Sequence, residues 1–137
     1  MKKITLLFSM VIITLFSGCN KDDDSPELPA APNINGEWNL VNVSNSTTLN
    51  DNFAPGLITW TFSSNSNTIE VVNNNTDDTM ESILLTGSYS YSVEENTGTA
   101  ECSKNIFIDT IDFGCFTLTN DEMTIGHADG VVIKLVR

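Results

Sequence analysis

The sequence predicts an all-β domain, a small up-and-down antiparallel β-barrel of about eight strands. Apolar and polar residues alternate over several short runs, as in strands with one buried face. Short segments rich in Asn, Asp, Ser, Thr and Gly separate the runs, and no apolar pattern of helical period interrupts them. Short connections favour antiparallel neighbours, and closure removes both sheet edges. A β-sandwich of the same strands is the alternative, because periodicity does not separate the two.

Four strands are expected in the first half of the domain. The clearest is LITWTF, in which Ile58, Trp60 and Phe62 alternate with threonines and form one apolar face. TIEVV with Ile69 and Val71 and SYSYSV with Tyr89, Tyr91 and Val93 alternate in the same way, and Trp38 and Leu40 alternate in GEWNLVNV.

Four further strands are expected at residues 100–108, 115–118, 123–125 and 131–136. The segments between them have turn compositions: EENTG at 94–98, TND at 119–121 and ADG at 128–130. The Asp-Gly pair of the last segment suits a tight hairpin. These spacings predict consecutive, hairpin-connected strands.

The chain begins with the pattern of a secretory signal peptide. Lys2 and Lys3 precede an uncharged run at 4–16, and the small residues Ser17 and Gly18 follow. The run is shorter than the ~20 residues that a membrane-spanning helix needs. A signal peptide over residues 1–18 is therefore expected rather than a transmembrane anchor.

The segment Leu15-Phe16-Ser17-Gly18-Cys19 resembles the bacterial lipobox, although Phe16 replaces the usual aliphatic residue. The resemblance implies that Cys19 is diacylated and then becomes the mature N-terminus after cleavage by signal peptidase II. Two or three acyl chains on one residue anchor a protein firmly in a membrane. The membrane is thus an expected partner through Cys19.

Residues 19–33 are expected to form the lipidated cysteine and a disordered tether, because three prolines and consecutive acidic residues disfavour folding. Within it, Lys21-Asp22-Asp23-Asp24 resembles the export signal of Bacteroidetes surface lipoproteins. This resemblance implies an outer-membrane location facing the cell exterior. One folded domain follows, at residues 34–137.

The net charge excludes one class of partner, and the cysteine content predicts a covalent cross-link. The formal net charge of −12 repels phosphate backbones, so nucleic acid is not an expected partner. With Cys19 assigned to lipid, Cys102 and Cys115 remain in a chain bound for an oxidising compartment. A disulfide between them is predicted, with two free buried thiols as the alternative.

Gly36-Glu37-Trp38 opens the first expected strand, within the segment INGEWNL at 34–40, and this pattern resembles the Gly-x-Trp start of lipocalins and of small lipocalin-like Bacteroidetes lipoproteins. The resemblance implies a barrel over residues 34–137 and a late arginine, here Arg137, packed over Trp38. It also implies binding of a small hydrophobic ligand. True lipocalins are longer and carry an external helix, so a smaller lumen is expected here.

The candidate ligand-binding residues are the aromatic side chains Trp60, Phe62, Tyr89 and Tyr91, which a core of this size also requires. His127 lies two residues before Asp129, but no nucleophile motif accompanies the pair, so no catalytic residue is assigned. The acidic residues near Asp77 and Asp121 lack the spacing of a calcium loop. No metal or cofactor is expected.

The function predicted from the sequence is that of a membrane-anchored, surface-exposed lipoprotein with a lipocalin-like barrel. It is expected to be non-enzymatic and to bind a small hydrophobic ligand. The alternative is a protein-interaction or adhesion module of the cell envelope, with a protein partner at its acidic loops.

Overall fold

The computed structural model describes residues 32–99, 102–127 and 129–137. The predicted signal peptide, Cys19 and the tether as far as residue 31 lie outside the described residues. The part of the chain that is described contains no helix, and it therefore contains none that could cross a membrane. Its strands are β1 (Gly36–Ser44), β2 (Asn50–Asn52), β3 (Ile58–Ser63), β4 (Thr68–Asn73), β5 (Gly87–Thr99), β6 (Cys102–Ile108), β7 (Ile111–Leu118), β8 (Glu122–Gly126) and β9 (Val132–Val136).

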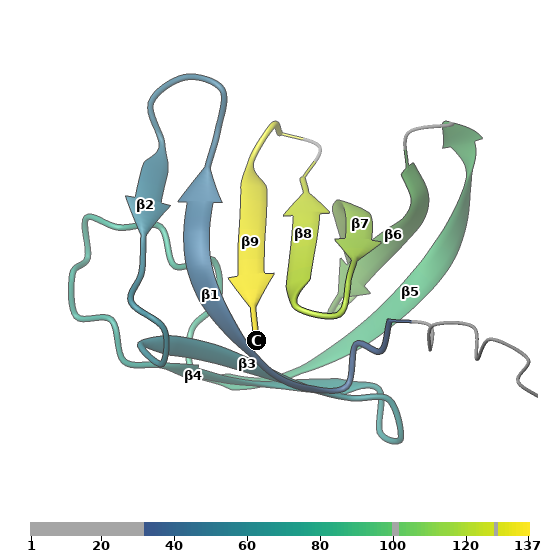
Figure 1. Ribbon diagram of the computed structural model, residues 1–137, viewed down its shortest axis with the longest axis horizontal. Helices are drawn as coiled ribbons and strands as arrows, with labels where there is room; N and C mark the ends of the chain where they lie inside the picture. The colour runs from purple at the N-terminus through teal and green to yellow at the C-terminus, as the bar shows by residue number, and fades with distance from the viewer. Residues whose placement is uncertain (1–31, 100–101, 128) are drawn as a thin grey trace, which may run out of the picture. The chain divides into compact units, whose positions relative to one another are not determined.

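The predicted fold class is confirmed: the domain is an antiparallel barrel (Figure 1). From β3 to β9 each strand pairs with the next one in the chain, and β1 pairs with β3 on one side and β9 on the other. Eight strands thus close on themselves, and β2 is an additional short strand beside β1. The β-sandwich alternative is excluded, because the pairing of β1 with β9 closes a single sheet.

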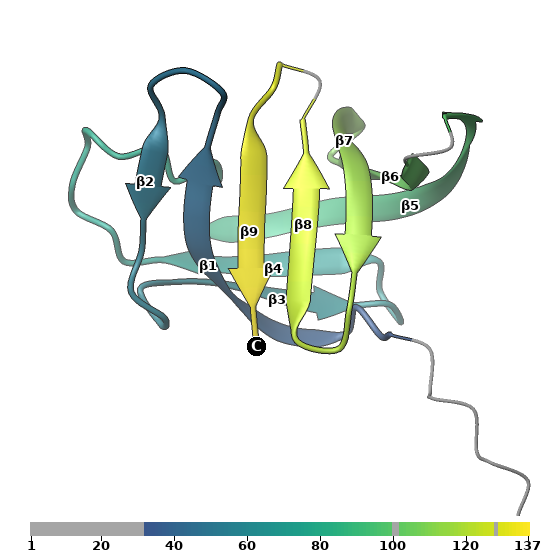
Figure 2. The same cartoon turned by 45° about the horizontal axis from the view of Figure 1, so that its top comes forward.

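A bulge in β1 allows this strand to pair with three other strands, β2, β3 and β9. Leu40 is paired with Leu135, whereas Asn42 is paired with Lys134, so Val41 is an extra residue. The bulge shifts the inward-facing side chains from even to odd positions, because Leu40 is buried before it and Val43 after it. Beyond the bulge the edge that faced β3 pairs with β2, which Figure 2 shows beside the upper part of β1.

The barrel interior is filled by side chains from every strand except β2. Trp38, Leu40, Ile58, Trp60 and Leu135 are among those with no exposed surface. The alternation that predicted the strands is the cause, because every second residue of a regular strand points inward. The remaining members of the core include Val43, Phe62, Ile69, Val71, Tyr91, Ile106, Ile108, Phe113, Phe116, Met123, Ile125 and Ile133.

One end of the barrel is closed by the two ends of the domain. The Trp38 Nε1–H donates to the Ile34 carbonyl oxygen at 2.7 Å, and the Arg137 guanidinium carbon lies 4.2 Å from the centroid of the Trp38 ring. Arg137 also donates to the carbonyl oxygens of Asn33, Asn35 (2.7 Å) and Asn120 (3.3 Å). The last residue is therefore bound to the first residues of the domain.

The predicted disulfide between Cys102 and Cys115 is confirmed. It joins the start of β6 to β7 and closes a short loop, a constraint worth roughly 3 kcal/mol in the chain-entropy estimate.

The prediction of a turn at 94–98 is wrong, because β5 continues to Thr99. Glu95 is paired with Lys104 of β6, and their side chains form an ion pair of 3.5 Å. Cross-strand pairing thus outweighs the turn composition of this segment.

Candidate functional site

The end of the barrel opposite Trp38 carries a mainly apolar pocket of about 250 Å³. Strand β9 runs from one end of the barrel to the other: Val131, which lines the pocket, precedes this strand, and Arg137, which contacts Trp38, follows it. The loops β1–β2, β4–β5 and β8–β9 meet the beginning of strand β7 here. We call this hollow the mouth pocket, and its lining consists of Leu49, Glu81, Ile83, Phe113, His127, Asp129, Val131 and Ile133.

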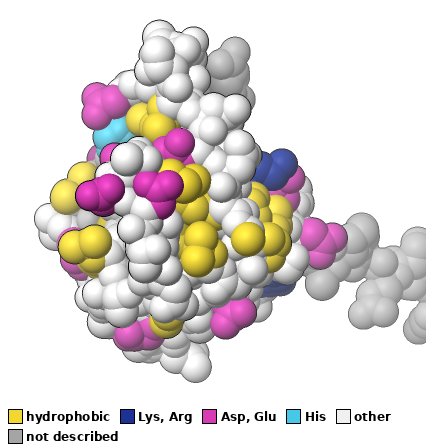
Figure 3. All heavy atoms as spheres, turned by 90° about the vertical axis from the view of Figure 1, so that its left-hand side faces the viewer, with side chains coloured by type: hydrophobic (Ala, Val, Ile, Leu, Met, Phe, Trp, Pro, Cys, Tyr) yellow, Lys and Arg dark blue, Asp and Glu magenta, His cyan; other side chains and the backbone are white. Residues whose placement is uncertain are grey.

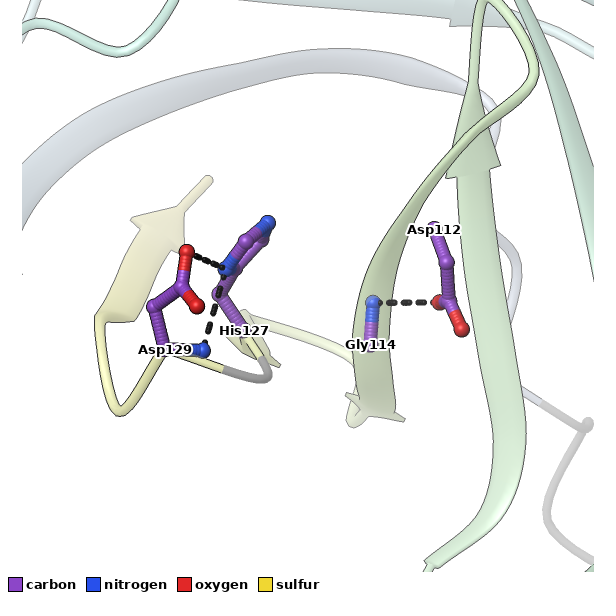
Figure 4. Close-up of polar contacts among 4 residues, drawn as sticks. All are labelled: Asp112, Gly114, His127 and Asp129. Atoms are coloured by element: carbon purple, nitrogen blue, oxygen red, sulfur yellow. Dashed lines mark hydrogen bonds and ion pairs between the residues drawn. The ribbon is translucent and has the colours of Figure 1, made fainter.

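A second bulge, in β7, turns Phe113 toward the mouth pocket. Asp112 is paired with Phe107 and Gly114 with Ile106, so Phe113 is the extra residue. The Asp112 carboxylate accepts a hydrogen bond from the Gly114 N–H at 2.8 Å and fixes the bulge (Figure 4). Phe113 is 9% exposed and forms one wall of the pocket.

Only glycine fits at the centre of this bulge. Gly114 has φ +91°, and a Cβ built on it would lie 2.2 Å from the Gly126 carbonyl oxygen. This close approach brings the bulge against the end of β8. The Phe113 ring consequently lies edge-on to the His127 imidazole, with 5.8 Å between the centroids.

His127 and Asp129 form the polar part of the lining on the β8–β9 connection. The His127 Nδ1 lies 3.3 Å from the Asp129 backbone N and 3.4 Å from Asp129 Oδ2 (Figure 4). An unprotonated Nδ1 accepts from the backbone N–H, whereas a protonated Nδ1 donates to the carboxylate. In both states the imidazole is held beside Phe113.

The β4–β5 loop contributes Ile83 to the pocket in a strained conformation. Ile83 has φ +67°, and the Leu84 N–H donates to the Ser82 carbonyl oxygen at 2.8 Å across it. This is a γ-turn with positive φ at its centre, which is costly for a β-branched residue. Two anchors hold the loop: the Glu81 N–H donates to Asp51 Oδ2 at 2.7 Å, and the Ile83 N–H donates to Glu81 Oε1 at 3.2 Å.

The charged groups of the lining are Glu81, His127 and Asp129. In Figure 3 the histidine, in cyan, lies beside apolar and acidic side chains, and no basic side chain adjoins it on this face. The basic residues of the described ranges are elsewhere: Lys104 is paired with Glu95, Lys134 with Glu122 at 2.7 Å, and Arg137 with Trp38.

The aromatic residues that the sequence suggested for ligand binding lie outside the mouth pocket. Trp60, Phe62 and Tyr91 belong to the core, where the Phe62 and Tyr91 rings meet edge-on with 5.2 Å between centroids. Burial raises the pKa of the Tyr91 phenol. Tyr89 is half-buried, and its hydroxyl donates to the Leu85 carbonyl oxygen at 2.8 Å. The Trp60 Nε1–H is buried and has no hydrogen-bond partner among the described residues.

The acidic β4–β5 loop borders a wider hollow of about 640 Å³. The hydroxyl and backbone N–H of Thr79 donate to the Asp77 carboxylate and lower the pKa of that carboxyl. Within the described residues no group of three or more His, Cys, Asp or Glu side chains is arranged to hold a metal ion. The local hydrogen bonds of Asp77 instead order its own loop.

Sequence reasoning missed the apolar residues of the mouth pocket: Leu49, Ile83, Phe113, Val131 and Ile133. They come from different loops and strand ends, and the barrel closure that brings them together leaves no local spacing. One signal was present. Asp112-Phe113-Gly114 places a glycine inside an apolar strand, which is typical of a bulge.

Comparison with known proteins does not place the chain in a family: no family model, no curated protein and no solved structure matches it.

Proposed function

We propose that this chain is a lipid-anchored binding protein of the cell envelope, whose barrel holds a small apolar ligand at the mouth pocket. The carrying observation is the composition of that pocket: five of its lining side chains are apolar, and its polar groups are confined to Glu81, His127 and Asp129. Ligand sites typically combine an apolar lining with a few placed polar groups.

The pocket size limits the ligand. Sites that enclose a drug-sized molecule have volumes of roughly 300–1,000 Å³. A hollow of about 250 Å³ therefore suits a short alkyl chain or a single ring. The buried core fills the interior beneath it, so a ligand would bind at the mouth instead of deep within the barrel.

The strain at Ile83 supports the same site. Unfavourable backbone conformations persist where the surrounding structure enforces them, and they cluster at functional sites. Here the Asp51 and Glu81 carboxylates accept hydrogen bonds from the Glu81 and Ile83 backbone N–H groups, and these bonds hold the Ile83 side chain over the pocket in spite of its unfavourable backbone conformation.

Binding is tested by titrating the full-length chain, carrying Cys19→Ser so that no acyl chain competes, with 1-hexanol. His127 is the only histidine, so its imidazole proton signals in ¹H NMR report on this pocket. A saturable shift is expected. Val131→Trp should abolish it by filling the pocket, whereas Val132→Trp, at an outward-facing position that is 39% exposed, should retain it. A shift that does not saturate, or one that survives Val131→Trp, contradicts the proposal.

The anchoring part of the proposal rests on the lipobox resemblance around Cys19 and the Lys-Asp-Asp-Asp run. The first described residues lie at the closed end of the barrel, where Arg137 binds Asn33 and Asn35, so the chain enters the domain at the end opposite the mouth pocket.

Metabolic labelling with an alkynyl fatty acid tests the anchor. The native chain should be labelled and Cys19→Ala should not, while labelling of both would refute lipidation at this residue. Protease added to intact cells tests the outward orientation: the domain should be degraded, and a domain that survives is not on the cell exterior.

A further inference from the structure

We propose that the ligand of the mouth pocket is an apolar amine, bound as its ammonium cation, and that acids of similar size are rejected. This inference rests on the proposed function and adds the chemical class of the ligand's polar end. It follows from the charges of the pocket lining, which can be counted residue by residue.

Glu81 and Asp129 supply two negative charges to the lining, and His127 supplies at most one positive charge. A protonated His127 lies 3.4 Å from Asp129 Oδ2 and is neutralised by it, which leaves Glu81. An unprotonated His127 leaves both carboxylates uncompensated. The lining is therefore negative in either state of the imidazole, and protonation of His127 does not create an anion site.

Charged groups around the pocket lining add to its negative charge. Asp51 accepts the Glu81 N–H at 2.7 Å, so a further carboxylate lies next to the lining. The basic side chains Lys104, Lys134 and Arg137 are occupied at other parts of the barrel. Among the residues that the structure describes, a carboxylate ligand would find no cationic partner at the pocket except His127, which Asp129 already engages.

The geometry also separates the apolar and charged parts of the ligand. Phe113 and Ile133 are buried, 9% and 1% exposed, whereas the Asp129 side chain is 83% exposed. A ligand whose hydrocarbon contacts the buried wall would therefore place its charged end among the carboxylates at the water-facing rim. An ammonium can stay partly hydrated there, which avoids the cost of burying a charge.

The size of the effect is limited, because exposed ion pairs are weak and screened by salt. We expect hexylamine to bind roughly three- to tenfold more tightly than hexanoate at low ionic strength, with 1-hexanol in between. At about 0.5 M salt the preference should shrink toward unity.

The test titrates hexylamine, 1-hexanol and hexanoate into the full-length Cys19→Ser chain at fixed pH, with the His127 proton signals as readout. The double variant Glu81→Gln/Asp129→Asn removes both charges, and its Gln side chain keeps an oxygen that can accept the Ile83 N–H. It should bind 1-hexanol as before and lose the preference for the amine. Glu37→Gln, an exposed carboxylate at the start of β1, is the matched control and should keep the preference.

The outcomes separate the two proposals. If hexanoate binds as tightly as hexylamine or more tightly, or if the double variant keeps the preference, the amine inference is overturned while the pocket stands. If none of the three compounds gives a saturable shift, the proposed function fails and the inference falls with it.

Discussion

The guanidinium of Arg137 lies 4.2 Å from the centroid of the Trp38 ring and donates to the carbonyl oxygens of Asn33 and Asn35. The final residue of the chain therefore holds the start of the first strand at the closed end of the barrel. This contact links Trp38 of β1 to the residue that follows β9, and the pairing of these two strands closes the sheet.

Arg137→Ala should lower the free energy of unfolding by about 1 kcal/mol, because the cation-π contact and the hydrogen bonds to the domain start are lost. For a domain of this size that change lowers Tm by about 4–8 °C. Lys104→Ala, which removes a surface ion pair with Glu95, should change Tm far less. Thermal unfolding monitored by circular dichroism measures both, and an unchanged Tm for Arg137→Ala would refute the structural role.

The two fully buried tryptophans should respond differently to replacement by phenylalanine. Trp38 loses a 2.7 Å hydrogen bond to Ile34 and part of its contact with Arg137, whereas Trp60 loses an indole N–H that has no partner among the described residues. Because an unsatisfied buried donor costs about 1–3 kcal/mol, its removal offsets part of the packing loss at Trp60. Urea unfolding should therefore show Trp38→Phe to be the more destabilising substitution. Equal losses would contradict this assignment.

The β7 bulge should tolerate only glycine at position 114. Gly114→Ala combines positive φ with a Cβ 2.2 Å from the Gly126 carbonyl oxygen, so we expect a loss of at least about 2 kcal/mol. Gly56→Ala is the matched control, since Gly56 has φ +83° but no atom within 4 Å of the new Cβ. It should cost only about 1 kcal/mol. Denaturant unfolding compares the two, and similar losses would show that contact with Gly126 is unimportant.

Ile83→Gly should separate stability from binding. Glycine relieves the positive φ of the γ-turn, which offsets the lost apolar contact, so the free energy of unfolding should change by less than about 1 kcal/mol. The affinity for 1-hexanol should nevertheless fall, because Ile83 forms a wall of the mouth pocket. Unchanged affinity in the His127 NMR titration would remove Ile83 from the site.

The strands with strict alternation were predictable from sequence, as LITWTF and TIEVV show: Ile58, Trp60 and Phe62 face the core as expected. The bulges at Val41 and Phe113 were not, because each changes the inward-facing parity within one strand. The mouth pocket was equally hidden. Leu49, Ile83 and Val131 lie in separate loops, and the closed barrel brings them together.

The position of a bound ligand shows whether the mouth pocket is the binding site. Intermolecular nuclear Overhauser effects between 1-hexanol and the full-length Cys19→Ser chain should connect the alkyl protons to Phe113, His127 and Ile133. Effects confined to other surfaces, such as the hollow near Val93 and Phe116, would refute binding at the mouth pocket, as would their complete absence at saturating ligand.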